Sequence, residues 1–550
     1  MRITNKIIQR NNLSNINTNK IYQDKLSTQM STQKKINRPS DDPVIAIRAL
    51  RLRSNVNEVT QYYSKNIPDA ESWLSVTEAG LKNLSQIMTN MIAQCTKGSN
   101  GPLKTSDRQI ILEELRGLGN EVYSTGDADY AGRYVFTGFR TDTSLSFMKE
   151  EKDLKYTITE QLDNTAIDSV TKVQTGNLLD INSSNFNDPN FNGTDMTAIS
   201  EDDVDAVECY RIRLAYNDCL DDVTNIKIEY TDSSQNPPVK VTWPGNGVTI
   251  TMKHSYDDPY SDVAVSEDDP PAVAQAKADA VIYVPETGEL LLGKNRYAEL
   301  MATKDQDNSP ENEGEIRVTY EKSDWMKGDL RPEHYFYCTS EADDPTNPGV
   351  KKTITYNENY LDVKAERQNI EYDVGFNQTI QVNSTADECF QHNVGREVDD
   401  IVNAMQDVLD LESTKAKIEE ILKSFDTENE GAANQNDIDI LNKQLKAVDK
   451  ALTYAKDKEQ KLFEKGISTF QKHLDDANLC ITDCGTRSRK LALIKNRMEN
   501  QKTTFDTLKS DNEDVDITEV AINLNSAELT YNAALMATGK VTQSTLLNFI

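Results

Sequence analysis

Apolar side chains recur about every 3.5 residues between residues 43 and 97, which is the spacing of a narrow coiled-coil seam. Asp42 can cap the first amides of a helix that begins here, and Pro43 suits its first position, where no amide donor is needed. Pro68 lies inside the stripe and should kink the helix or split it in two. The stripe consists of Ile45, Ala49, Leu52, Val56, Val59, Tyr63, Asn66, Ala70, Trp73, Thr77, Leu81, Leu84, Met88, Met91 and Cys95.

Three further helices are expected, over about 106–128, 394–424 and 437–510, with Asn and Gly around 429–436 separating the last two. The last would be roughly 110 Å long at 1.5 Å per residue. Its heptad seam should be buried against helices of the same chain, and its companion positions are mixed. The seam is Phe463, Phe470, Ala477, Cys484, Leu491, Met498 and Phe505, and the companions are Gly466, His473, Cys480, Arg487, Ile494, Gln501 and Leu508. In 106–128 one face carries Ile110, Ile111, Leu115, Leu118 and Val122.

The middle of the chain changes to a period of two, which indicates strands. Residues 239–243 and 248–252 alternate on either side of a Pro-Gly-Asn-Gly turn and predict a hairpin, as do 282–284 and 290–292 around a second turn. The fold class predicted is α+β. We expect an elongated helical coiled-coil rod formed by both termini, with a large β-rich insertion over about 140–390.

The composition is polar and strongly acidic. Hydrophobic residues make up 37% of the chain, mean hydropathy is -0.64 and the formal net charge is -30. Phosphate binding needs clustered Lys and Arg, so no nucleic-acid partner is expected. No stretch approaches the roughly 20 apolar residues of a membrane span, and no apolar run of signal-peptide length follows Met1. These features alone predict a cytoplasmic protein, unless an export route without a cleaved signal carries it outside.

Candidate catalytic and metal-binding chemistry is sparse. The four histidines stand neither in metal-ligand spacing nor beside paired carboxylates. Acidic clusters at 201–205 and 257–262 could bind Ca²⁺, but they lack the EF-hand pattern and are better interpreted as solvated loops. No catalytic residue, cofactor or metal site is expected, and the chain is not predicted to be an enzyme.

Seven cysteines contain no closely spaced pair of the kind that binds zinc, and most are expected to be free thiols. Cys480 and Cys484 lie one helical turn apart, which could suggest a redox pair. Both fall on the seam positions, so a role as small buried hydrophobic residues is favoured.

The last 34 residues are apolar and almost uncharged, with two acids and one lysine. Their helix-compatible pattern ends in Leu-Leu-Asn-Phe-Ile, an aggregation liability for a free monomer. Such an end makes sense if another subunit covers it.

Motifs at both ends resemble the hook-associated protein 3 family of bacterial flagellar hook–filament junction proteins, which are relatives of flagellin. The match runs in order through both terminal regions and is specific as a set. Near the start it comprises Arg38, Pro39, Ser40, Asp41, Asp42 and Pro43, then the segment with Arg133, Phe136 and Gly138. Near the other end it comprises Arg487, Tyr531, Leu535, Val541, Leu546, Leu547 and Ile550, with their neighbours.

The resemblance implies an extracellular structural protein that the flagellar type III apparatus exports without a cleaved signal. Its partners would be further copies of itself, the other hook-associated protein, flagellin or the filament cap, and an export chaperone. It also implies three regions: 1–42 with 513–550 as terminal assembly and export helices, 43–139 with 391–512 as a flagellin-like helical rod with a small hairpin, and 140–390 as a β-rich outer domain.

Two alternatives stay open. The chain could be a filament flagellin with a large outer domain, or an enzyme or adhesin carried on a flagellin-like rod. The second would require a cluster of chemically active residues in 140–390, and the sequence shows none there.

Overall fold

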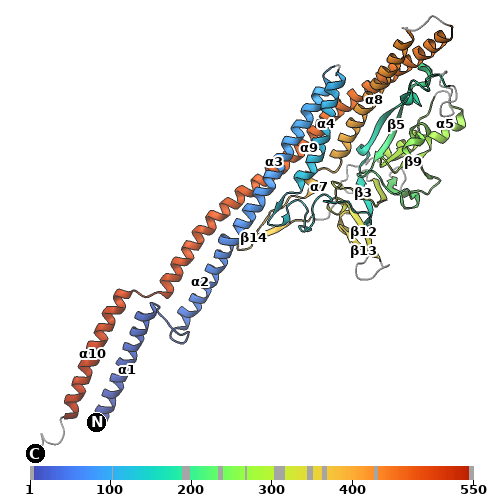
Figure 1. Ribbon diagram of the computed structural model, residues 1–550. Coiled ribbons are helices and arrows are strands. Elements are labelled where there is room, and N and C mark those ends of the chain that lie inside the picture. The colour runs from blue at the N-terminus through green and yellow to red at the C-terminus, as the bar shows by residue number, and fades with distance from the viewer. Residues whose placement is uncertain are drawn as a thin grey trace, which may run out of the picture. The chain divides into compact units, whose positions relative to one another are not determined.

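A computed structural model describes residues 5–101, 103–188, 199–232, 239–266, 269–302, 316–343, 351–361, 368–426 and 432–543 (Figure 1). The chain forms two compact units. The terminal unit contains Met1–Ser72, Glu371–Gln381 and Arg487–Ile550, and the central unit contains Trp73–Ile370 and Val382–Thr486. The predicted α+β class is confirmed, since long helices occupy both ends of the sequence and strands occupy its middle.

The order of elements follows the expected helix–strand–helix pattern. The helices are α1 (Asn5–Thr32), α2 (Pro43–Gln61), α3 (Ile67–Ser99), α4 (Thr105–Gly126), α5 (Pro271–Ala278), α6 (Lys294–Met301), α7 (Ala386–Cys389), α8 (Val394–Asp426), α9 (Ala432–Glu513) and α10 (Ile517–Gln543). The strands are β1 (Asp129–Tyr130), β2 (Arg133–Tyr134), β3 (Lys155–Leu162), β4 (Ile167–Gln174), β5 (Asp205–Arg213), β6 (Lys227–Asp232), β7 (Val239–Trp243), β8 (Ile250–Met252), β9 (Val281–Val284), β10 (Glu289–Leu292), β11 (Ile316–Lys322), β12 (Tyr337–Asp343), β13 (Lys351–Tyr356), β14 (Glu371–Gly375) and β15 (Gln378–Gln381).

A π turn, Tyr62–Asn66, interrupts the first long stripe just before Pro68. The amide of Ile67 donates to the carbonyl of Tyr62, five residues back, and α3 then begins. Proline has no amide to donate and its ring crowds the preceding turn, so a locally widened turn is a favourable place for it. The expected split at Pro68 is confirmed, although the chain stays helical through it.

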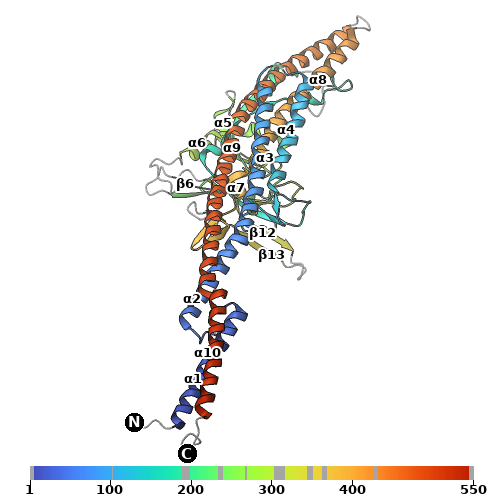
Figure 2. The ribbon, with the colours of Figure 1, turned by 90° about the vertical axis from the view of Figure 1, so that its left-hand side faces the viewer.

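Four helices of the central unit run alongside one another, α3, α4, α8 and α9 (Figure 2). Phe463, Phe470, Ala477 and Cys484 on α9 are fully buried, as the heptad predicts. Gly98 shows how closely α3 approaches α9, because a Cβ there would lie 2.4 Å from the ring of Phe463. This packing follows the ordinary rule that small residues at a crossing let helices come near one another.

The prediction for α4 is wrong in part. Ile110 is 61% exposed and Leu118 is only half buried, whereas Leu112 and Gly119 are buried with the rest of the face. The buried stripe follows Ile111, Leu115 and Val122, and Ile110 lies one residue off it. When two neighbouring positions such as Ile110 and Ile111 are both apolar, the sequence alone does not show which of the two side chains faces the core.

Two large sheets and the small β1–β2 pair form the β part of the central unit. The six-stranded sheet has the order β13-β12-β3-β11-β6-β7 and is antiparallel throughout. The five-stranded sheet has the order β4-β5-β10-β9-β8, in which only β8 and β9 pair in parallel. The hairpin predicted at 282–284 and 290–292 is confirmed as β9–β10.

The other predicted hairpin is wrong. β7 and β8 are strands, but they belong to different sheets: β7 pairs with β6, and β8 pairs with β9. Only Gly245 and Val248 bridge across the turn. Alternation correctly predicted two strands, whereas their partners depend on long-range packing, such as that of buried Trp243 against Tyr230.

A salt-bridge group ties the five-stranded sheet to α8. Arg211 on β5 is 4% exposed and pairs with Glu289 of β10 and with Asp400 of α8. Arg213 pairs with the same Asp400. Burial would raise the pKa of Asp400, but the two guanidinium groups outweigh it and lower that pKa.

The distal part of the α8–α9 hairpin has its own core, which the sequence did not predict. Side chains from residues 178–186 and 199–204 pack on it, and the buried members are Leu178, Ile181, Phe186, Ile199, Val204, Val408, Leu411, Ile418, Leu441, Ala447, Val448, Ala451, Leu452 and Ala455. Gln444 also donates to the carbonyl of Phe186. This segment therefore covers an apolar face that the two helices alone would leave exposed.

Candidate functional site

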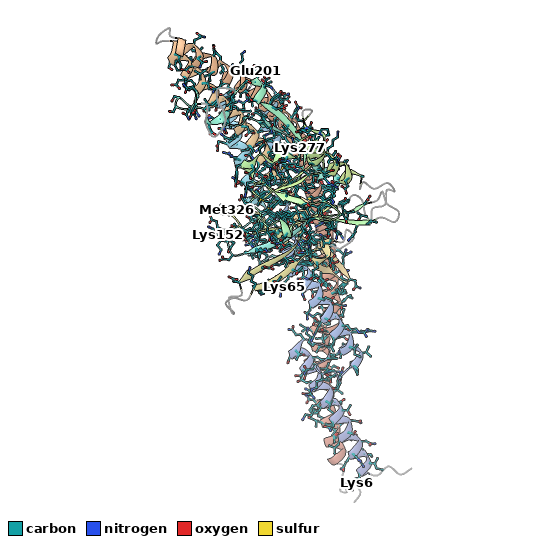
Figure 3. All side chains as sticks on the ribbon, turned by 90° about the vertical axis from the view of Figure 1, so that its right-hand side faces the viewer. Lys6, Lys65, Lys152, Glu201, Lys277 and Met326 are labelled. Atoms are coloured by element: carbon teal, nitrogen blue, oxygen red, sulfur yellow. The ribbon has the colours of Figure 1, made fainter. Side chains whose placement is uncertain are left out.

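The candidate site is the terminal unit, where α1 and α10 lie side by side (Figure 1). Their shared core is small and consists of Leu26, Val520 and Ala527, with Val515 and Leu524 packed against it. Gln23 adds a hydrogen bond to Glu528. Figure 3 shows Lys6 towards the free end of this helix pair.

The same two helices carry many exposed apolar side chains. Those on α1 are Ile7, Leu13, Ile21, Tyr22 and Met30, and those on α10 are Ile517, Ile522, Leu529, Leu535 and Met536. Their exposed fractions reach 67% at Ile21 and 73% at Leu529. Exposed apolar surface of this extent marks an interaction site rather than a solvated face.

The two segments that join these helices to the rest of the unit pair with each other. The amide of Lys35 donates to the carbonyl of Glu513 at 2.7 Å, and the amide of Val515 donates to the carbonyl of Gln33 at 3.2 Å. Lys34 also pairs with Asp514, and this contact lowers the pKa of that carboxyl. These hydrogen bonds thus fix the segment that follows α1 against the segment that precedes α10.

Arg53 and Glu513 form a bidentate ion pair between α2 and the end of α9. Nε and Nη2 of Arg53 donate to the two carboxylate oxygens at 2.6 and 2.7 Å. Glu513 is 3% exposed, and the hydrogen-bonded guanidinium lowers its pKa. Fork-to-fork pairing of this kind adds geometric specificity to the electrostatic energy.

The family motif at 38–43 is a turn followed by a helix cap. Asp41 accepts hydrogen bonds from the amides of Asn37 and Arg38, which lower its pKa. Asp42 accepts from Val44 and Ile45 and so caps α2, and Pro43 occupies the first helical position as predicted. The side chains of Arg38, Pro39 and Ser40 are exposed.

The β14–β15 hairpin fastens several elements of the terminal unit together. Asn66 donates to the carbonyl of Asp373 at 2.8 Å, and Tyr372 donates to Asp69. Phe376 at the turn makes edge contacts with the rings of Tyr62 and Phe505. Lys65 lies in the π turn beside this hairpin (Figure 3).

Arg133, Phe136 and Gly138 belong to the central unit. The guanidinium of Arg133 lies 4.9 Å from the ring centre of Trp73, and Phe136 is fully buried against Phe390. Gly138 has a φ of 60°, and a Cβ there would lie 2.5 Å from the amide oxygen of Gln368. The motif therefore builds a tight turn that packs inward.

Sequence reasoning missed the role of Arg108 in joining α4 to α8 and α9. Arg108 is 2% exposed and donates to both carboxylate oxygens of Glu459 and to one of Glu412. The sequence did contain a signal for this contact. Arg108 is a basic residue on the otherwise apolar side of a predicted helix, and two other predicted helices carry acidic residues.

The remaining predicted residues are dispersed. Arg487 is half buried on α9, and Tyr531 is half buried and Leu535 exposed on α10. The structure brings Arg38–Pro43, Tyr531 and Leu535 into the terminal unit but not into one cluster. The side chain of Val541, and all of Leu546, Leu547 and Ile550, lie outside the described residues.

The possible metal ligands and the histidines are dispersed over the residues that the structure describes. They contain no group of three or more His, Cys, Asp or Glu placed to hold a metal ion. Two histidines share hydrogen bonds with carboxylates, His254 with Glu286 and His473 with Glu397. Burial lowers the pKa of His334 and of His392 to about 4. None of the helices within the described ranges is both long and apolar enough to cross a membrane.

Comparison with known proteins connects the amino-terminal helices to the flagellum. Residues 3–141 match the family described as the bacterial flagellin N-terminal helical region. This match lies within the first 141 of the 550 residues of the chain. Flagellar hook-associated protein 3 of Salmonella typhimurium and that of Escherichia coli are each 28% identical to it over 145 residues. The resemblance inferred from the terminal motifs is thereby confirmed.

These matches cover part of each protein. The 145 residues are 26% of this chain and 45% of each hook-associated protein 3. A flagellin of Clostridium tyrobutyricum is 28% identical over 122 residues, 22% of this chain and 32% of that protein.

The chain also aligns with solved structures, at low identity and low TM-score. A putative flagellar hook-associated protein from Vibrio parahaemolyticus aligns with 86% of this chain and 100% of its own, at 13% identity and a TM-score of 0.31. Flagellar hook-associated protein 3 from Legionella pneumophila aligns with 80% of this chain and 98% of its own, at 10% identity and a TM-score of 0.21.

Proposed function

We propose that this chain is a structural protein that joins the flagellar hook to the filament. The observation that carries the proposal is the helix pair α1–α10, which has a core of three buried side chains and an exposed apolar surface far larger than that core. It occurs in a chain whose residues 3–141 match the flagellin amino-terminal helical region. A helix pair of this kind is suited to burial between copies in an assembly.

In this proposal the three regions have separate tasks. Residues 1–42 with 513–550 assemble with neighbouring subunits, 43–139 with 391–512 form a supporting helical rod, and 140–390 form the outer domain. The partners are further copies of the chain, the other hook-associated protein, and flagellin or the filament cap. The protein has no enzymatic task, and it functions in the flagellum outside the cell.

Export without a cleaved signal, by the flagellar type III system, is part of the same proposal. The exposed apolar residues of α10, among them Ile522 and Leu529, require protection before assembly. A dedicated chaperone that covers the carboxyl-terminal helix would supply it.

A filament flagellin with a large outer domain is the second candidate, supported by the match to the Clostridium flagellin. Copy number separates the two functions. A junction protein is a trace component of isolated flagella, whereas a filament flagellin is their main component. Quantitative mass spectrometry of sheared flagella decides between them.

The test of assembly uses exposed side chains that do not support the fold. Ile522→Ser with Leu529→Ser removes apolar groups that are 64% and 73% exposed on α10. Each is worth roughly 1.5–3 kcal/mol when buried by a neighbour. Cells that express only this variant should build hooks and release unpolymerised flagellin, as seen by electron microscopy and by analysis of the medium.

Matched controls separate assembly from folding. Leu479→Ser with Leu493→Ser removes side chains that are 69% and 71% exposed on α9 and should leave filaments intact. Deletion of 541–550 should abolish filaments, whereas excision of 150–385 with a short linker should be milder. Full-length filaments on cells carrying the α10 variant would refute assembly through the termini.

A further inference from the structure

A polar cavity of about 450 Å³ lies in the central unit, where the five-stranded sheet meets the helices α8 and α9. Arg213, the last residue of β5, lines it from the sheet. Arg396 on α8 and Asn393, the residue before that helix, line it from the other side. A second cavity of about 720 Å³ shares Ala215 and Arg396 with it. The volume suits a small organic molecule.

Three buried polar atoms of these lining residues have no hydrogen-bond partner among the described residues. They are Nε of Arg213, Nε of Arg396 and Oδ1 of Asn393. The orientation of the Asn393 amide follows from its other end, because Nδ2 donates to Glu397 at 2.9 Å. Buried donors and acceptors that stay unpaired cost free energy. The lining therefore offers two guanidinium donors and one amide acceptor to a ligand.

The lining of this cavity is positively charged, although the whole chain carries a net charge of -30. Four basic and three acidic side chains line it, which leaves an excess of one positive charge. His392 adds none near neutral pH, because burial lowers its pKa to about 4. The basic residues are Arg213, Arg396, Lys465 and Lys472, and the acidic ones are Asp168, Glu397 and Asp400.

The guanidinium groups of the lining share too few carboxylates. Asp400 pairs with both Arg211 and Arg213, so one negative charge faces two positive ones. Arg396 lies 3.8 Å from the exposed carboxylate of Asp399. Burial lowers the pKa of Arg213 to about 10; Asp400 opposes this change, and the nearby Arg396 and Arg211 add to it. One further anion in the cavity would stabilise the charged guanidinium groups.

We propose that this cavity binds a small hydroxycarboxylate, a monoanion with a hydroxyl group and a compact apolar part. Its carboxylate matches the donor geometry of a guanidinium group and neutralises the excess positive charge. Its hydroxyl donates to Oδ1 of Asn393. Its apolar part lies against the aliphatic lining, which includes Leu162, Ala166 and Leu462. A zwitterionic amino acid would leave the excess charge uncompensated.

Isothermal titration calorimetry of the full-length chain with mandelate tests this site. Mandelate has a carboxylate, a hydroxyl and one apolar ring, and it should bind at one site per chain with a Kd of about 1 mM or tighter. Phenylacetate lacks the hydroxyl and should bind about fivefold more weakly, because Asn393 then has no donor. Mandelamide lacks the charge and should give no measurable binding. Inorganic phosphate should not displace mandelate.

Variants whose folding is verified by circular dichroism connect the binding to this cavity. Arg396→Gln should weaken mandelate binding about tenfold or more. Asn393→Leu should remove the difference between mandelate and phenylacetate. Ala166→Phe fills the cavity without changing its charge and should abolish binding, so it decides the matter even if Arg396→Gln fails to fold. Lys461→Met, an exposed residue of α9 outside the lining, is the control and should bind normally.

Several results would overturn the proposal. They are the absence of mandelate binding to the natural chain, equal affinity for mandelate and mandelamide, and unchanged binding in folded Ala166→Phe. Displacement of mandelate by inorganic phosphate would show a site for simple anions instead, and would also overturn the assignment to hydroxycarboxylates.

Discussion

Arg108 places a guanidinium between two carboxylates inside the central unit, with side chains of Arg108 and Glu459 that are 3% and 6% exposed. Arg108→Met would leave Glu459 buried without its partner. Removing one partner of a buried ion pair typically costs about 3–5 kcal/mol. We expect this loss in chemical or thermal unfolding of the central unit.

Two variants define the control for this prediction. Arg116→Met, also on α4, removes an exposed pair with Glu113 and should change stability by less than about 1 kcal/mol. Glu459→Gln added to Arg108→Met should restore part of the loss. Equal effects of the Arg108 and Arg116 substitutions would contradict a structural role for the buried pair.

Glu160 on β3 is a fully buried carboxyl whose burial raises its pKa to about 7. One oxygen accepts from Tyr320 and from the amide of Ala215, and the other has no hydrogen-bond partner among the described residues. The folded chain therefore holds a proton that the unfolded chain, with a pKa near 4.5, has already lost. The free energy of unfolding should fall as pH rises from about 4.5 to 7 and then level off.

Glu160→Gln mimics the protonated form and should remove this contribution to the pH dependence. Above pH 7 the variant should be more stable than the natural chain by about 3 kcal/mol, since each pKa unit corresponds to about 1.4 kcal/mol. Denaturant titrations at pH 5 and pH 8 measure the difference. Exposed Glu208→Gln on β5 is the control and should leave the slope unchanged.

At the residue scale, the sequence predicted which residues are buried or cap a helix better than it predicted which residues contact one another. The seam residues of α3, and those of α9 from Phe463 to Met498, are buried because a 3.5-residue period directly encodes one face of a helix. The cap Asp42 and Pro43 follow from equally local rules. The Arg53–Glu513 pair joins residues 460 positions apart, which no local pattern encodes.

At the scale of elements, the carboxyl-terminal end of the α9 seam is less buried than the heptad pattern predicts. Met498 is 1% exposed and lies against Gly375 in the β14–β15 hairpin, whereas Phe505 is only half buried and makes an edge contact with Phe376. The expectation that Phe505 is fully buried is therefore wrong. An aromatic residue at a seam position needs a partner helix along its whole length, and here a hairpin turn covers one side.

The two substitutions should differ accordingly. Met498→Ala should reduce the free energy of unfolding by about 2–5 kcal/mol, as for a buried large-to-small change. Phe505→Ala should cost less, about 1–2 kcal/mol, since part of the Phe505 side chain is already exposed to water. Thermal unfolding of both purified variants tests the order. A larger loss for Phe505→Ala would contradict the packing described for α9.

The boundaries of the elements were predicted closely, whereas the pairing and packing of the elements were predicted less well. Helices expected at 394–424 and 437–510 are observed as α8 and α9 with only slightly longer bounds. Pro68 predicted an interruption but not its form as a π turn, because one widened turn has no sequence pattern of its own. The separation of β7 and β8 into different sheets, and the packing of residues 178–186 and 199–204 on α8 and α9, arise from tertiary contacts.

At the scale of the whole molecule, the terminal helices are the part whose order should depend on assembly. α1 has 28 residues and α10 has 27, yet among their described side chains only Leu26, Val520 and Ala527 are buried. Fixing each backbone residue costs about 1–2 kcal/mol, and single helices of this length are marginal in water without tertiary packing. In a free monomer the pair should therefore open readily.

Trypsin measures this opening at sites that the sequence provides. Lys6, Arg10, Lys20 and Lys25 on α1 and Lys540 on α10 are exposed and should be cleaved first in the purified monomer. Arg489 and Lys490 are equally exposed, but they lie in α9, whose neighbouring Leu491 is fully buried, and should be cleaved much later. In intact flagella neighbouring subunits would cover α1 and α10, so their sites should become as resistant as those of α9. Identical cleavage rates at the α1 sites in monomer and in flagella would show that assembly does not bury these helices.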